Sequence, residues 1–267
     1  MELTNPLTYL QYGFGIKAVI SAILTGITCS AVGTYVILRK MAFIGAGLSH
    51  VAFAGVAFGL LVGSSPILWA FLFSAAAGIA LWYFSSKKAV HYDVTIGVLF
   101  AVSMGLAVVF LSFSSSYGSE ALSYLFGSPL SASTLDLILL STATLLTFLF
   151  YLFFWREVYI VTFSKDIAKA SGYNVELITF SATILISLVV TLSIKAVGAL
   201  LVFSLLVMPA ASAYRFSRSY GEFFFFSVTF GFTSSFLGIL LSFTLDIPSG
   251  AAITLISFLI FLLSAIK

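Results

Sequence analysis

Charged residues are scarce in this sequence. Its 267 residues include 12 Lys and Arg and 9 Asp and Glu, so 8% of the chain is charged, against roughly 25% in ordinary soluble domains. Hydrophobic residues make up 61% of the chain, with 29 Phe and 12 Tyr. A soluble protein of this size cannot hide so much apolar surface. The composition therefore excludes a soluble enzyme, a nucleic-acid-binding protein and a disordered chain, and it indicates an integral membrane protein.

Cysteine is almost absent, and one nucleotide-binding motif is missing. Cys29 is the only cysteine, which excludes an intrachain disulfide and a thiolate metal cluster. The sequence has no G-x-x-x-x-G-K-[ST] phosphate loop, so we expect no ATP hydrolysis by this chain itself. The first residues lack a basic region and a small-residue cleavage site, so we expect the first hydrophobic stretch to be a permanent span.

Carboxylates are missing from the centres of the hydrophobic stretches. Three of the nine, Glu120, Asp136 and Asp246, fall at the outer edge of a stretch, and the others fall at the N-terminus or near expected cytoplasmic loops. Proton-coupled carriers usually place Asp or Glu inside the membrane as relays. A proton-driven antiporter is therefore disfavoured.

The hydrophobic stretches predict an all-α bundle of about nine transmembrane helices in a single domain, 1–267. A helix needs about 20 mostly apolar residues to cross a hydrocarbon core, and the stretches show no alternation typical of barrel strands. Charges and Gly/Pro/Ser clusters mark the breaks between them. The predicted spans are 14–38, 42–62, 67–84, 94–113, 135–155, 175–194, 197–214, 223–245 and 249–266.

The basic residues predict an orientation, because Lys and Arg in short loops stay cytoplasmic. With the N-terminus outside and the C-terminus inside, only Lys17 and Lys195 fall toward the outside. The ten cytoplasmic positions are Arg39, Lys40, Lys87, Lys88, Arg156, Lys165, Lys169, Arg215, Arg218 and Lys267.

His50 is the first candidate site residue. It follows Arg39 and Lys40 by about ten residues, which at 1.5 Å per residue places it about 15 Å into the membrane. An ionisable residue at that depth suggests a functional site, and imidazole is a common metal ligand. The alternative is a histidine that only bonds a neighbouring helix.

A second candidate is a short helix between Ser164 and Gly172. Ser164 is a suitable N-cap, Asp166 suits the first turn, and Gly172 suits the stop. A helix of about two turns is marginal alone in water. We therefore expect either the bundle or a soluble partner to support it, and the alternative is a helix lying on the bilayer surface.

Several motifs together resemble the permease subunits of zinc/manganese-type ABC transporters. They are RKMAFIGAGLSHVAFAGVAFG from Arg39, DVTIGVLFAVSMGLAVV from Asp93, LSYLFGSPLSAS from Leu122 and KAVGALLVFSLLVMPAASAY from Lys195. Pro209 in the last motif interrupts a helical hydrogen-bond ladder, which frees a carbonyl toward a cavity or simply bends the span.

The resemblance implies a fold similar to type II ABC importer permeases. It also implies a homodimeric pore in the cell membrane, a separate cytoplasmic ATPase and an extracytoplasmic metal-binding protein. The segment 164–173 resembles the coupling helix, with Ser164, Asp166, Ala168 and Gly172 as its key positions. The outer gate or pore lining is expected to include Ser49, Tyr124, Gly127, Met208 and Pro209, and His50 is expected to contact the metal transiently.

One position departs from the family pattern. Many relatives carry Asp at the position of Ala46, one helical turn before the histidine, where the two side chains would share a face. With His50 alone, a weaker transit site is expected, and conduction requires that a site also release its ion.

We therefore expect a permease that imports a divalent transition metal. Zinc is the leading candidate, with manganese or iron as alternatives, because imidazole suits several of these ions. No permanently bound cofactor and no nucleic acid are expected. The alternative from another class is an ATP-independent metal channel or secondary carrier.

Overall fold

The computed structural model describes residues 12–86, 92–113, 124, 127, 129 and 132–266. Within these residues, nine helices are long and apolar enough to cross a membrane, which confirms the predicted architecture. A tenth, short helix, α8, lies between two of them. The helices are α2 (Gly13–Leu38), α3 (Ile44–Val62), α4 (Pro66–Ser86), α5 (Tyr92–Ser112), α7 (Thr134–Phe163), α8 (Lys165–Ala170), α9 (Val175–Val197), α10 (Ala199–Phe216), α11 (Tyr220–Leu245) and α12 (Ser249–Ile266).

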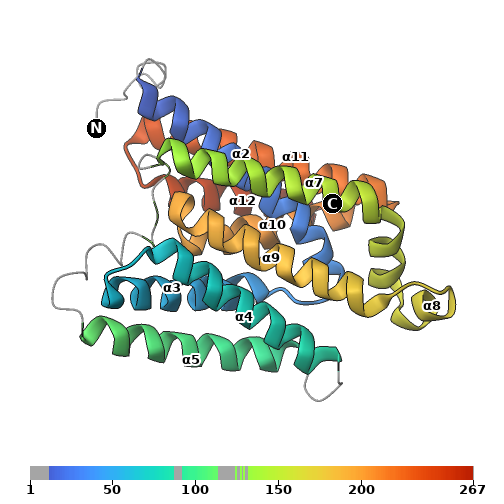
Figure 1. Ribbon diagram of the computed structural model, residues 1–267. Helices are drawn as coiled ribbons and strands as arrows, with labels where there is room; N and C mark the ends of the chain where they lie inside the picture. The colour runs from blue at the N-terminus through green and yellow to red at the C-terminus, as the bar shows by residue number, and fades with distance from the viewer. Residues whose placement is uncertain are drawn as a thin grey trace.

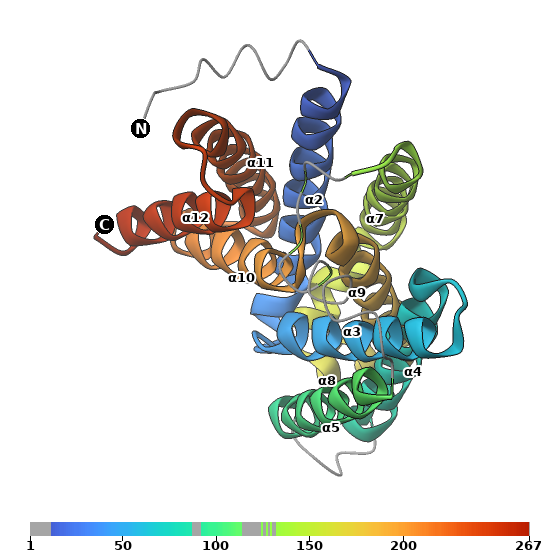
Figure 2. The same cartoon turned by 90° about the vertical axis from the view of Figure 1, so that its left-hand side faces the viewer.

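The helices form two groups around a shared centre. Helix α2 packs against α7, α9, α10 and α11, and it stands among them in both views (Figures 1 and 2). Helix α3 packs against α4 and α5, and α12 covers α10 and α11. Contacts of α9 with α4 and of α10 with α3 join the two groups.

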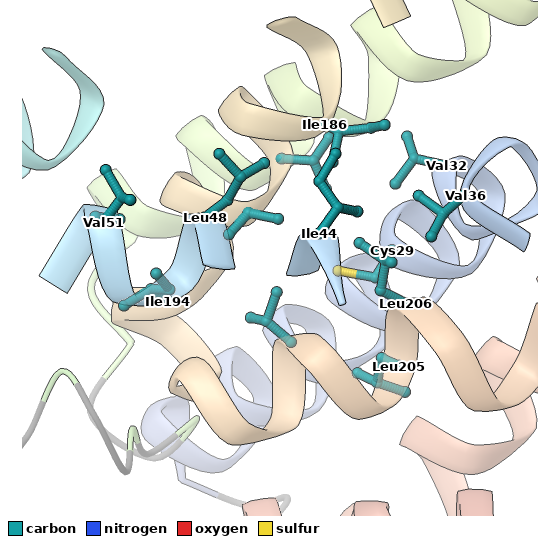
Figure 3. Packing of buried hydrophobic residues seen from close by; sticks show 14 of the residues in the cluster. Cys29, Val32, Val36, Ile44, Leu48, Val51, Ile186, Ile194, Leu205 and Leu206 are labelled. Carbon is teal, nitrogen blue, oxygen red and sulfur yellow. The ribbon is translucent and has the colours of Figure 1, made fainter. Parts of the chain in front are cut away.

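The hydrophobic core lies where α2, α3, α9 and α10 meet. Figure 3 shows side chains from all four helices converging there. Most residues of α2 and α3 are buried, whereas fewer than a third of the residues in the most apolar window of α5, α7 or α12 are buried. Exposed apolar side chains are expected on helices that face lipid or another subunit. The labelled members of this core are Cys29, Val32, Val36, Ile44, Leu48, Val51, Ile186, Ile194, Leu205 and Leu206.

Small residues let α2 and α11 cross at close range. A Cβ added at Gly26 would collide with the Ser235 hydroxyl and come within 2.5 Å of the Gly231 carbonyl oxygen. A Cβ at Gly231 would in turn meet Ser30. The Ser227 hydroxyl donates a hydrogen bond of 2.7 Å to the Ser30 carbonyl. Close backbone approach through small residues, with a hydroxyl bridge, is a common way for membrane helices to associate.

Two predicted boundaries differ from the structure. The span predicted to end at 155 continues as helix to Phe163, with non-helical dihedral angles at Phe154, and the chain bends there (Figure 1). The charges of Arg156 and Glu157 mark this bend rather than the end of the helix. The break expected at Lys195 lies instead at Gly198, whose φ of 84° ends α9.

The helices alternate in direction, so their loops fall at two ends of the bundle. We call the end that carries α8 the α8 end (Figure 1). Among the described basic residues, seven lie at the α8 end and two, Lys17 and Lys195, lie at the opposite end. Lys87, Lys88, Lys267 and Glu120 lie outside the described residues. The seven at the α8 end are Arg39, Lys40, Arg156, Lys165, Lys169, Arg215 and Arg218.

Candidate functional site

His50 lies on α3 beside α5. It is the seventh residue of a 19-residue helix, so it lies about 9 Å from the start of α3, which is at the α8 end, and about 4.5 Å from the middle of the helix. Its ring meets the ring of Phe100 edge-on, with centroids 4.5 Å apart and an interplanar angle of 79°. The Nδ1 atom is buried and has no hydrogen-bond partner among the described residues. Within the described part of the chain, Nδ1 therefore does not make the hydrogen bond to a neighbouring helix that was the alternative prediction for His50.

A partly uncovered stripe runs along α3 through this histidine. Phe43, Ala46 and His50 are spaced by three and four residues, so they share one face. Phe43 is exposed, and Ala46 and His50 are half-buried. The Phe43 ring stacks on Phe203 of α10, with centroids 6.2 Å apart. The stripe is thus bordered by α5 through Phe100 and by α10 through Phe203.

The structure separates Ser49 from this stripe. Ser49 is fully buried, and its hydroxyl has no partner among the described residues. Adjacent residues on a helix point about 100° apart, so Ser49 lies toward the interior of the bundle while His50 lies toward the stripe. A role for Ser49 in the pore lining stays a prediction, and in this conformation the residue does not share the face of His50.

Met208 and Pro209 lie in α10, which packs against α3. Met208 is half-buried, and its sulfur accepts a hydrogen bond of 3.5 Å from the Ser204 hydroxyl. Pro209 is buried within the helix and cannot donate a backbone hydrogen bond. One turn earlier along α10, the Leu206 carbonyl lies so close to α2 that a Cβ at Gly33 would collide with it. The proline therefore falls where α10 is pressed against the central helix.

At the opposite end of the bundle, part of the predicted gate motif packs against the junction of α9 and α10. Gly127 has a φ of 60°, and an added Cβ would collide with the backbone of Val197 and Gly198. Tyr124 packs partly buried against the core. The rest of the predicted gate motif, apart from Pro129, Ala132 and Ser133, lies outside the described residues.

An ion pair joins two helices at this same end. The Lys195 Nζ of α9 lies 2.8 Å from a carboxylate oxygen of Asp136, which is only 4% exposed. Asp136 also accepts hydrogen bonds from the Ser133 hydroxyl at 2.6 Å and the Ser133 backbone at 2.9 Å, completing the N-terminal capping box of α7. Asp136, predicted to lie at the edge of the membrane, is thus a structural carboxylate rather than a relay.

The predicted short helix is present as α8. Ser164 caps it by accepting a hydrogen bond of 3.3 Å from the Ile167 N–H. It ends with two bonds of 3.0 Å, from the Gly172 N–H to the Lys169 carbonyl and from the Tyr173 N–H to the Ala168 carbonyl. With Gly172 at φ 81°, this pair of bonds is a Schellman stop. Both capping residues therefore act as the sequence indicates.

The two sides of α8 face different surroundings. Ala168 is fully buried against the core of the chain, whereas Asp166, Ile167 and Lys169 are exposed. The bundle therefore anchors α8 through Ala168 and leaves Ile167 available on the surface. Sequence reasoning placed Ala168 at a coupling position, and the structure assigns it the anchoring side of the helix.

No group of three or more His, Cys, Asp or Glu side chains is placed to hold a metal ion within the described residues. His50 accordingly belongs to no such group in one copy of the chain. Phe100, the neighbour of His50 on α5, was not predicted from the sequence. The spacing of Ile96, Phe100, Ser103 and Ala107 along α5 could have indicated a face that packs on α3.

Known proteins resemble this chain over nearly its whole length. The ABC 3 transport family matches residues 11–267. "Manganese transport system membrane protein MntC" of Halalkalibacterium halodurans is 31% identical over 255 residues, covering 96% of this chain and 87% of its own. "High-affinity zinc uptake system membrane protein ZnuB" of Haemophilus influenzae is 31% identical over 250 residues, covering 92% of this chain and 96% of its own.

Solved structures agree with the sequence comparison. PsaBC from Streptococcus pneumoniae, solved in complex with Fab, includes a chain that matches with a TM-score of 0.85 and 29% identity, covering 97% of this chain and 94% of that one. An inward-facing putative metal-chelate type ABC transporter shares the fold, with a TM-score of 0.79 at 16% identity. The nine membrane helices, the capped α8 and these full-length matches agree, and the chain belongs to the ABC 3 transport family of metal-ion ABC transporter permeases, multi-pass proteins of the cell membrane.

Proposed function

We propose that this permease imports a divalent transition-metal ion, with zinc as the leading candidate. The observation that carries the proposal is the uncovered α3 stripe around His50. Relatives named for manganese and for zinc are about equally similar to this chain, so similarity alone does not choose between the two ions. Carboxylates favour manganese, whereas imidazole suits zinc well. With Ala46 beside His50 and no carboxylate in the stripe, the donor set favours zinc.

The proposed path needs a second copy of the chain. The stripe is only half covered by α5 and α10 in one copy, and an open apolar face inside a membrane would admit lipid rather than an ion. A second copy packed face to face would enclose the stripe and bring a second His50 toward the first. Two neutral imidazoles would form a weak site that can also release its ion.

The proposed motor is a separate ATPase subunit at the α8 end, and a metal-binding protein delivers the ion at the opposite end. The support is the position of α8, which is anchored by Ala168 and exposes Ile167. The family name ABC implies ATP-driven transport, which disfavours the alternative of an ATP-independent channel or carrier.

Growth rescue tests the proposal. In a bacterial strain that lacks its own zinc importers, the permease expressed with its ATPase and metal-binding protein should restore growth at low zinc, and the permease with the metal-binding protein but without the ATPase should not. His50→Ala should abolish rescue, while Phe14→Ala, a change at an exposed apolar position near the start of α2, should not. Rescue by the permease without the ATPase would support the channel alternative instead. If growth is rescued at low manganese but not at low zinc, manganese rather than zinc is the transported ion.

A further inference from the structure

Tyr92 joins three parts of the chain at the α8 end. It is the first residue of α5, and its ring lies 6.0 Å from the Arg39 guanidinium carbon and 5.7 Å from the Lys165 Nζ. A cation within about 6 Å of an aromatic centroid is attracted to the ring face. Lys165 is the first residue of α8. Arg39 follows α2, and its Nη1 donates a hydrogen bond of 3.4 Å to the Val161 carbonyl in the bent part of α7.

Helix α5 is built as a rod with one face on α3. Tyr92, Ile96 and Phe100 follow one another at intervals of four residues, so they lie along one face. The rod lies directly on α3, because a Cβ at Gly47 would come within 2.8 Å of the Ile96 side chain. Only Ile96, Ser103 and Ala107 of α5 are buried. Apart from α3, α5 packs only lightly on α4, so a displacement of α5 along α3 would disturb mainly the contacts of one helix pair.

The same face of α5 ends at the candidate metal ligand. Eight residues separate Tyr92 from Phe100, which is about 12 Å along a helix. The Phe100 ring meets the His50 ring edge-on, with centroids 4.5 Å apart, and the Nδ1 atom of His50 is buried with no partner among the described residues. Helix α5 thus carries two aromatic rings on one face. The Tyr92 ring contacts Lys165 of α8, and the Phe100 ring contacts His50.

We propose that Tyr92 is a positioning residue that transmits movement of α8 through α5 to Phe100, and that Phe100 controls access of the metal to His50. The proposal deepens the function proposed above and rests on it. When the motor displaces α8, Lys165 draws the Tyr92 ring and α5 with it. Phe100 then leaves or returns to the His50 ring, so access to the imidazole follows the state of the ATPase.

A transport assay with two variants of Tyr92 tests the relay. Permease and ATPase are reconstituted in vesicles with the metal-binding protein supplied on the side opposite the ATPase, and zinc uptake and ATP hydrolysis are measured together. Tyr92→Phe keeps the aromatic face and should behave as wild type. Tyr92→Leu removes it and should lower zinc uptake about tenfold, the equivalent of two cation–π contacts, while ATP hydrolysis continues. Equal uptake by both variants, or loss of ATPase binding in Tyr92→Leu, would overturn the proposal.

Chemical labelling of His50 tests the relay without measuring transport. The chain has two histidines, so a His91→Asn background leaves His50 as the only one, and diethyl pyrocarbonate reports its accessibility. Labelling should change between nucleotide-free and ATP-bound complexes in wild type and in Tyr92→Phe. In Tyr92→Leu it should lose this dependence, and in Phe100→Ala it should stay high in both states.

The two assays separate failure of the relay from failure of the proposed function. Labelling that follows nucleotide in a protein that moves no zinc would leave the relay intact and refute zinc import. Labelling that ignores nucleotide in wild-type protein that imports zinc would refute the relay alone.

Discussion

The side chain of His50 lies between the packed protein and an uncovered face of α3. Its Nδ1 atom faces the protein interior without a partner among the described residues, while the half-buried ring borders an uncovered stripe of α3. A nitrogen without an internal partner stays available to a ligand that reaches it. The nearest substitution that would change this chemistry is at Ala46, one turn away on the same face.

Replacing Ala46 with Asp should convert the weak transit site into a tighter-binding site. A carboxylate about 4 Å from a divalent ion contributes far more than the roughly 1.4 kcal/mol that equals tenfold in affinity, even at an effective dielectric constant of about 20. We expect Ala46→Asp to bind metal at least about tenfold more tightly, to release it more slowly and to shift preference toward manganese. Isothermal titration with zinc and manganese measures both changes. Ala46→Asn is the matched control without charge, and equal affinities for the two variants would contradict the prediction.

Residue roles were predictable where local chemistry determines them. Ser164 and Gly172 cap α8 as their residue types indicate, and His50 is identified by its position in an apolar stretch. The roles of Phe100 and Tyr92 depend on contacts with other helices, which no local pattern encodes. The burial of Ser49 and Ala168 was missed because it depends on which neighbours each helix meets.

At the scale of single elements, the α2–α11 crossing has the least tolerance for added volume. Gly26→Leu should prevent the close approach and lower the stability of the permease by about 1–3 kcal/mol or more, since even a Cβ would collide with Ser235. Thermal unfolding in detergent measures the effect. Gly97→Leu is the matched control, because an added Cβ there meets nothing within 4 Å. A Gly26 variant as stable as the control would contradict the proposed packing.

The exposed side of α8 should bind the ATPase. Ile167 is 52% exposed although it is apolar, and Ile167→Glu would place a charge in the proposed contact. We expect this variant to fold normally and to lose most of its ATPase binding in a pull-down. Ile167→Leu provides the matched control, because it keeps an exposed apolar side chain of similar volume at the same position. If Ile167→Glu keeps both ATPase binding and transport, the exposed side of α8 is not the coupling surface.

Helix boundaries were predictable where charge and membrane edge coincide. Eight of the predicted spans lie within a few residues of the observed helices. The exception is α7, where Arg156 and Glu157 lie beyond a bend inside a continuing helix. Charge reports where a helix leaves an apolar environment, but a helix that turns at that point keeps its backbone hydrogen bonds. The sequence alone therefore could not distinguish a bend from an end.

Across the whole molecule, the charge asymmetry predicts which end faces the cytoplasm. Single cysteines at Arg215 and Arg218, introduced into a Cys29→Ser background, should react with a membrane-impermeant maleimide only after the cells are opened. A cysteine at Ser64, in the exposed turn between α3 and α4 at the opposite end, should react in intact cells. Labelling of Arg215→Cys in intact cells would invert the orientation and, with it, the proposed direction of transport.

The central claim is that this chain moves a divalent metal ion only when a separate ATPase drives it. Reconstituted vesicles measure this directly. Permease and ATPase are inserted so that the ATPase faces the outside, and the metal-binding protein, zinc and a zinc-sensitive dye are enclosed in the vesicles. The account predicts zinc movement toward the ATPase side that requires ATP and disappears with His50→Ala. Zinc movement of equal rate without ATP, or unchanged in His50→Ala, would contradict it.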